Sequence, residues 1–153
     1  MVRRHLSIPF RVLDLPEVNV AIFSFLLHFV WEMQQMPFFV EPSHWTIWDT
    51  TQVYTKATLG DVGIALTAFW VVAALTKSRR WVLQPAWGQV AGFVAVGVVI
   101  TIVFEFLATE VYGRWQYVTT MPTLPILGTG LSPLLQWIIL PPLVVWFVRR
   151  QLT

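Results

Sequence analysis

Three polar residues within one apolar run, His28, Glu32 and Gln35, have a spacing that would let them act together. At positions i, i+4 and i+7 they lie on one face of a helix. A second carboxyl, Glu105, and an amide, Gln136, interrupt later apolar runs. A charged carboxylate in hydrocarbon costs several kcal/mol or takes up a proton, so these side chains are expected to face one another, an aqueous cavity or a ligand. Ionisable residues at such positions indicate a functional site.

The chemistry that this set of groups favours is proton transfer. A carboxyl removed from water among Phe, Leu and Trp side chains stays protonated near neutral pH. We expect Glu32 to donate a proton to an olefin or epoxide, His28 to tune or reprotonate Glu32, and Glu105 to stabilise the resulting carbocation. The predicted catalytic residues are therefore Glu32, His28 and Glu105. This is isomerase, cyclase or hydratase chemistry on an isoprenoid, sterol-like or lipid substrate, and it requires no cofactor and no metal.

The residues expected to contact the substrate lie at similar depths. At about 1.5 Å per helical residue, Glu32 and Gln136 lie roughly 5 Å, and Glu105 roughly 10 Å, to the outer side of the midplane. Tyr112 falls on the same α-helical stripe as Glu105, and indole faces stabilise cations. The predicted substrate-binding residues are Trp31, Gln35, Asp61, Tyr112, Trp115, Gln136 and Trp137.

Long apolar runs must position these side chains. Of the 153 residues, 56% are hydrophobic and 12% are charged, and the mean hydropathy is +0.65. A soluble domain carries about 25% charged residues, so an ordinary water-soluble fold is excluded. A membrane-spanning helix needs roughly 20 apolar residues, and the chain has such runs at residues 18–39, 59–76, 87–109 and 131–148. We predict an all-α, polytopic membrane four-helix bundle that forms a single domain over residues 1–153.

The basic residues predict the orientation of this bundle. Eight of the ten Lys and Arg lie before the first run, between the second and third, or after the fourth; only Lys56 and Arg114 lie in the other two loops. The positive-inside rule then places both termini in the cytoplasm, in what we expect to be a bacterial inner (plasma) membrane. The outer loops, 37–58 and 110–130, are long and rich in aromatic residues and Pro. They are expected to form either an interfacial aromatic belt or a lid over the outer helix ends.

Several short motifs resemble the emopamil-binding, sterol-isomerase-like (EXPERA) family. These motifs are His28-x-x-x-Glu32, Gly60-Asp61, Thr109-Glu110 and Trp137-x-x-x-Pro141. The resemblance implies a four-helix membrane core with His and Glu side chains around a lipid-binding cavity. The pair Trp31-Glu32 is also similar to a pair in small integral membrane terpene cyclases, where the Glu would supply a proton. The surrounding pattern resembles uncharacterised small bacterial membrane proteins as well.

Other functions remain open at this point. The chain has no Cys, which excludes disulfides and thiolate metal sites. The alternatives are a non-enzymatic lipid- or quinone-binding membrane subunit, a small transporter, and a metal-dependent membrane enzyme that uses His28, Glu32 and Glu105. The expected partners are the membrane and a hydrophobic small molecule or lipid, with no nucleic acid. Gly88 and Gly92 indicate close helix packing, within the subunit or in a homodimer.

Overall fold

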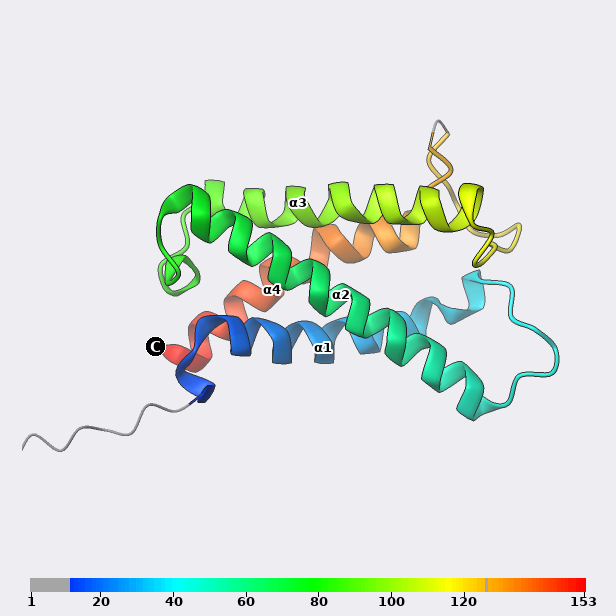
Figure 1. The fold of residues 1–153 in the computed structure, drawn as a ribbon, viewed down its shortest axis with the longest axis horizontal. Coiled ribbons are helices and arrows are strands. Elements are labelled where there is room, and N and C mark those ends of the chain that lie inside the picture. The colour runs from blue at the N-terminus through cyan, green and yellow to red at the C-terminus, as the bar shows by residue number, and fades with distance from the viewer. Residues whose placement is uncertain (1–11, 126) are drawn as a thin grey trace, which may run out of the picture.

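The computed structural model describes residues 12–125 and 127–153, which form a bundle of helices (Figure 1). Within these ranges there are four long α-helices: α1 (Pro16–Gln35), α2 (Ile47–Thr76), α3 (Trp87–Phe106) and α4 (Leu131–Leu152). A π-helical turn, Leu107–Val111, continues α3. Short 3-10 turns lie at Val12–Asp14, Met36–Phe38 and Trp81–Leu83. The prediction of an all-helical fold is therefore confirmed for the described residues.

The four helices pack in a ring in which α1 and α3 each contact both α2 and α4. The start of α1, the α2–α3 connection and the end of α4 lie at one end of the bundle (Figure 1). The segments 36–46 and 112–130 lie at the opposite end, which we call the loop end. The basic residues Arg3, Arg4 and Arg11, which contribute to the predicted orientation, lie outside the described residues.

Two helix boundaries differ from the predicted runs for identifiable reasons. Helix α1 ends at Gln35 and passes into the 3-10 turn Met36–Phe38 rather than running to near residue 39, because Pro37 lacks the N–H that would continue the α-helical hydrogen bonds. Helix α2 begins at Ile47, well before residue 59. Thr46 caps it, since the Asp49 N–H donates to Thr46 Oγ1 at 3.3 Å and the Thr46 N–H donates to Asp49 Oδ2 at 2.9 Å. Much of the predicted loop 37–58 is therefore helical.

Three helices are long and apolar enough to cross a membrane: α2, α3 with its π-helical turn (Trp87–Val111), and α4. Helix α1 is not among them, since it carries several polar residues. Its buried positions include Asn19, Ser24, His28, Glu32 and Gln35. Its side chains that face away from the bundle are instead apolar: Ile22, Leu26 and Val30 are 40%, 54% and 55% exposed. This polarity is the reverse of that in a helix of a water-soluble protein.

Close packing between α3 and α4 holds the centre of the bundle in place. A Cβ at Gly97 would lie 2.0 Å from Trp137 Cε3, so the missing side chain leaves room for the indole. Trp137 is 1% exposed, and its ring lies 4.9 Å from the ring of His28. A Cβ at Gly92 would meet Val72 Cγ2 of α2 at 3.6 Å, whereas none of the described atoms lies within 4 Å of one at Gly88. Gly92 thus serves packing within the chain, and a homodimer through Gly88 stays a prediction.

Candidate functional site

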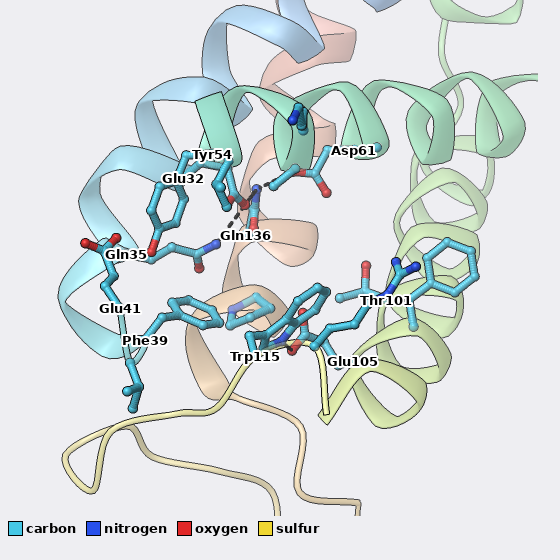
Figure 2. Close-up of a pocket in the computed structure, with 18 of the residues that line it drawn as sticks. Glu32, Gln35, Phe39, Glu41, Tyr54, Asp61, Thr101, Glu105, Trp115 and Gln136 are labelled. Atoms are coloured by element: carbon cyan, nitrogen blue, oxygen red, sulfur yellow. Dashed lines mark hydrogen bonds between the residues drawn. The ribbon is translucent and has the colours of Figure 1, made fainter. Parts of the chain in front are cut away.

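A cavity of about 540 Å³ lies between the four helices at the loop end (Figure 2). This volume falls within the range of about 300–1,000 Å³ that is usual for small-molecule sites. Most of its wall is aromatic or aliphatic, and segments 36–46 and 112–130 contribute to it. Four carboxyl groups also line it: Glu32, Glu41, Asp61 and Glu105. The cavity therefore combines an apolar surface with acidic groups from α1, α2, α3 and a loop.

The side-chain amide of Gln136 joins three titratable groups at one side of this cavity. Its Nε2 lies 2.8 Å from His28 Nδ1, 3.2 Å from Glu32 Oε1 and 3.1 Å from Asp61 Oδ2. Gln136 is 2% exposed, and Figure 2 shows it beside Glu32 and below Asp61. We call His28, Glu32, Asp61 and Gln136 the amide cluster. It unites side chains from α1, α2 and α4.

The amide cluster has more acceptors than the amide can satisfy. An amide nitrogen carries two hydrogens, so Gln136 cannot donate to all three neighbours at once. His28 Nδ1 and Asp61 Oδ2 lie 3.3 Å apart, close enough to share a proton directly. The three groups are therefore all hydrogen-bonded only when one of them donates a proton to another, as a protonated His28 Nδ1 would to Asp61 Oδ2. This arrangement suits a group that gains and loses a proton.

A chain of hydrogen bonds fixes the carboxyl group of Glu32. Gln35 Nε2 donates to Glu32 Oε1 at 2.7 Å, and Ser132 Oγ donates to Gln35 Oε1 at 2.8 Å. Trp31 Nε1 in turn donates to Ser132 Oγ at 3.3 Å. Trp31 thus joins α1 to α4 and does not line the cavity, so its contact with a substrate stays a prediction. Consecutive helical residues point about 100° apart, which turns Trp31 away from the face of Glu32.

The fourth helix of the ring, α3, supplies Glu105, which is held by residues of segment 112–130. Its Oε2 accepts hydrogen bonds from the Tyr117 hydroxyl and, at 3.4 Å, from Trp115 Nε1. The Tyr117 oxygen also accepts the Gly130 N–H at 3.1 Å, at the start of α4. Burial of Tyr117, reinforced by the charge of Glu105, raises the pKa of its phenol above the ordinary value. Tyr117 therefore fixes Glu105 relative to α4.

The two loop-end segments are joined by backbone hydrogen bonds. The Val40 N–H donates to the Gln116 carbonyl at 2.9 Å, and the Val118 N–H donates to the Phe38 carbonyl at 3.0 Å. The rings of Phe39 and Tyr117 lie 5.4 Å apart. Since segments 36–46 and 112–130 both line the cavity, this pairing makes them a connected part of its wall.

The structure brings most of the predicted site residues to one place. Those that line the cavity are Glu32, Gln35, Asp61, Glu105, Trp115, Gln136 and Trp137. His28 lies behind the wall, 1% exposed, and contacts two residues that line the cavity, Gln136 and Trp137. Tyr112 is 67% exposed and does not line the cavity, so its contact with a substrate stays a prediction. The π-helical turn before it has more residues per turn than an α-helix, which shifts Tyr112 off the stripe of Glu105.

Sequence reasoning missed several residues of the site. Tyr54 and Glu41 line the cavity, and Glu41 Oε2 accepts from Thr50 Oγ1 at 3.3 Å. Tyr117 donates a hydrogen bond to Glu105. Lys56, which entered the sequence analysis only in the prediction of membrane orientation, lines the cavity as well. No local spacing marks these residues, because each belongs to a loop or to the part of α2 that hydropathy predicts to be a loop.

No metal-binding arrangement was found in the part of the chain that the structure describes: no group of three or more His, Cys, Asp or Glu side chains is placed to hold a metal ion. Comparisons of the sequence and structure with family models, with curated proteins and with solved structures find no match. The fold and the site therefore describe this class of protein without a known relative. It is a helical bundle in which three apolar helices are long enough to cross a membrane, with a cavity whose mostly apolar wall carries four carboxyl groups.

Proposed function

We propose that this is an integral membrane enzyme that carries out acid–base chemistry on a hydrophobic isoprenoid, sterol-like or lipid substrate, as an isomerase, cyclase or hydratase. The observation that carries the proposal is the contact of one buried amide, that of Gln136, with His28, Glu32 and Asp61 at the wall of an apolar cavity. One amide with two hydrogens is surrounded here by three titratable groups, so at least one proton lies between the titratable groups themselves when all of them are hydrogen-bonded. The motifs that resemble the EXPERA family support the same class, since His28, Glu32, Asp61 and Trp137 meet here.

In the proposed reaction, Glu32 donates its proton to one carbon of a double bond and a carbocation forms at the neighbouring carbon. The carboxylate of Glu105 and the indole faces of Trp115 and Trp137, which line the same cavity, would stabilise that cation. Loss of a proton from an adjacent carbon to the Glu105 carboxylate gives an isomer. Attack by water followed by loss of a proton from the added water gives an alcohol. Attack by a second double bond gives a ring and a new cation, which loses a proton to Glu105 in the same way. A proton held between His28 and Asp61 restores the acid.

The proposal includes four membrane spans with both termini cytoplasmic, in a bacterial plasma membrane. Helix α1 supports the fourth span, because its apolar side chains face outward and its polar ones face the other helices. The described basic residues outside the loop end are Lys77, Arg79, Arg80, Arg149 and Arg150, all in the α2–α3 connection or the last turn of α4. That distribution supports a cytoplasmic position for this end.

Deuterium uptake tests the proposal whatever the identity of the substrate. Purified protein is incubated in D₂O with a lipid extract of bacterial membranes and with squalene and farnesol as defined olefins. Mass spectrometry then follows the carbon-bound deuterium. Each of the three reactions would place one solvent-derived hydrogen on carbon, so wild-type protein should label a product. Glu32→Gln, which keeps the shape and the hydrogen bonds but removes the acid, should lower the labelling rate by about 10²–10⁴-fold.

Glu110→Gln is the matched control, because Glu110 lies at the same end of the bundle, is exposed and does not line the cavity. This variant should label products at the wild-type rate. Thermal unfolding of the same samples shows whether Glu32→Gln folds. If the folded wild-type and Glu32→Gln proteins give the same labelling, Glu32 is no proton donor. If both bind a lipid but label nothing, the protein is a lipid- or quinone-binding subunit.

A further inference from the structure

Two basic side chains from distant parts of the chain line the same cavity as the acids. Lys56 comes from α2 and Arg114 from segment 112–130. They are the only Lys or Arg at the loop end among residues 12–125 and 127–153. The two basic side chains at the loop end therefore line one cavity, although they are far apart in the sequence.

The carboxyl groups and the cations of the cavity differ in how the protein satisfies them. Each carboxyl accepts a hydrogen bond from a protein side chain: Glu32 from Gln35, Asp61 from Gln136, Glu105 from Tyr117 and Glu41 from Thr50. By contrast, within the described part of the chain, the side chains of Lys56 and Arg114 form no ion pair and no hydrogen bond. Every carboxyl thus has a protein donor, although Glu41 Oε1 is buried without a partner. The exposed side chains of Lys56 and Arg114 remain free to pair with an anion of a bound molecule.

Lys56 lies nearer to the loops than the Asp61 of the amide cluster does. Lys56 precedes Asp61 by five positions on α2, which places it about 7 Å nearer to the loops along the helix axis. Arg114 is next to Trp115, whose indole N–H donates to Glu105. A ligand with an anionic head at Lys56 and Arg114 would therefore extend its apolar part along the wall toward Gln136.

We propose that Lys56 and Arg114 form a phosphate-binding subsite, and that the substrate or ligand of the cavity is a hydrophobic chain that carries a phosphate group. This inference rests on the proposed function for the nature of the chain. A phosphate ester carries between one and two negative charges at neutral pH, which matches two cations, whereas a carboxylate would leave one of them without a partner. The guanidinium group also presents paired donors that fit phosphate oxygens. The phosphate comes either from a free isoprenyl phosphate or from the headgroup of a bilayer lipid.

Binding of two probes that differ only in the phosphate tests this subsite. The full-length protein in phosphatidylcholine nanodiscs is titrated with farnesyl phosphate and with farnesol. Trp fluorescence provides the signal, because Trp45, Trp115 and Trp137 line the cavity. Wild-type protein should bind farnesyl phosphate about tenfold more tightly than farnesol. Lys56→Gln and Arg114→Gln should each lose most of that preference and bind farnesol as the wild type does, which also shows that they are folded. Arg80→Gln, an exposed cation at the opposite end, should keep it.

The possible outcomes separate this inference from the proposed function. If wild-type protein binds both probes equally, or if Lys56→Gln and Arg114→Gln keep the preference, the subsite is overturned while the cavity stands. If wild-type protein binds neither probe, both proposals fail. Nanodiscs with phosphatidylglycerol in place of part of the phosphatidylcholine distinguish the two sources. Competition that depends on Lys56 and Arg114 identifies a bilayer headgroup, and its absence together with the tenfold preference identifies a free phosphate ester.

Discussion

A single neutral residue, Gln136, organises the most reactive part of the site. Its amide nitrogen contacts an imidazole and two carboxyl groups that come from two other helices. An Asp or Glu at this position would add a further negative charge beside Glu32 and Asp61, and a Leu would remove the amide that donates to Asp61 and would leave Glu32 with Gln35 as its donor. A neutral amide can hold acidic groups together in an apolar surrounding in either of their protonation states.

Tyr117 performs a similar task for Glu105, and its contribution depends on pH. An unfolded tyrosine ionises at about pH 10, whereas burial and then the Glu105 charge raise the pKa of Tyr117 in the folded protein. Between these two pKa values the folded state keeps a proton that the unfolded state has lost. The free energy of unfolding should therefore fall as the pH rises above about 10, and this contribution should be fully present below it. Unfolding of the detergent-solubilised protein between pH 8 and pH 11 measures this effect.

Tyr117→Phe should flatten that decline, because it removes the ionising group. At pH 8 it should also lower the free energy of unfolding by about 1–2 kcal/mol, since Glu105 loses a donor and the Gly130 N–H loses its acceptor. Tyr112→Phe is the control, because Tyr112 is mostly exposed, and its pH profile should follow the wild type. Parallel profiles for wild type and Tyr117→Phe would refute this role.

Among the helices, α1 packs against its neighbours through its polar face. Its buried face carries an amide, a hydroxyl, an imidazole and a carboxyl, and its outward face carries Ile and Leu. In lipid the hydrophobic effect does not drive helices together, so hydrogen bonds and close contacts decide the packing. The bond from Trp31 to Ser132, the bond from Ser132 to Gln35 and the contact between Gln136 and His28 are of this kind and join α1 to α4.

The contact of α3 with α4 depends on Gly97, and a pair of glycine substitutions tests it. Gly97→Ala should destabilise the protein by about 1–3 kcal/mol, because its Cβ would overlap the ring of Trp137, which is buried against His28. Displacement of Trp137 should also disturb the amide cluster and lower any Glu32-dependent activity. Gly92→Ala on the same helix meets only an ordinary contact at 3.6 Å and should be close to neutral. Thermal unfolding of both variants in one detergent makes the comparison. Equal stability of the two would show that α3 can move away from Trp137.

For the whole molecule, the proposed topology of four membrane spans can be measured directly. The chain has no native Cys, so single cysteines report without background. Ser43→Cys, in segment 36–46, should react with a membrane-impermeant maleimide added to intact cells. Ser78→Cys, in the α2–α3 connection, should react only after the membrane is made permeable. The reverse pattern would invert the orientation, and labelling of both from one side would show that α2 does not cross the membrane.

The amino-acid sequence by itself determined the all-helical fold and the approximate positions of the helices, because apolar runs of membrane length leave few alternatives. It also pointed to Glu32, Gln35, Glu105 and Gln136, since a polar side chain in an apolar run is conspicuous. The positions of helix ends were less certain. The capping box at Thr46 and the π-helical turn before Tyr112 depend on local hydrogen bonds that hydropathy does not record.

Only the tertiary structure decided which polar groups touch. Asp61 reaches Gln136 from 75 positions away, and Tyr117 reaches Glu105 because segment 112–130 folds back over the end of α3. Lys56 and Arg114 share a cavity for the same reason. Helical periodicity fixes the direction of a side chain relative to its own helix, whereas these contacts depend on the rotation of each helix against its neighbours and on the path of the loops. Such rotations are set by packing details like the fit of Trp137 over Gly97, which arise only when all four helices are assembled.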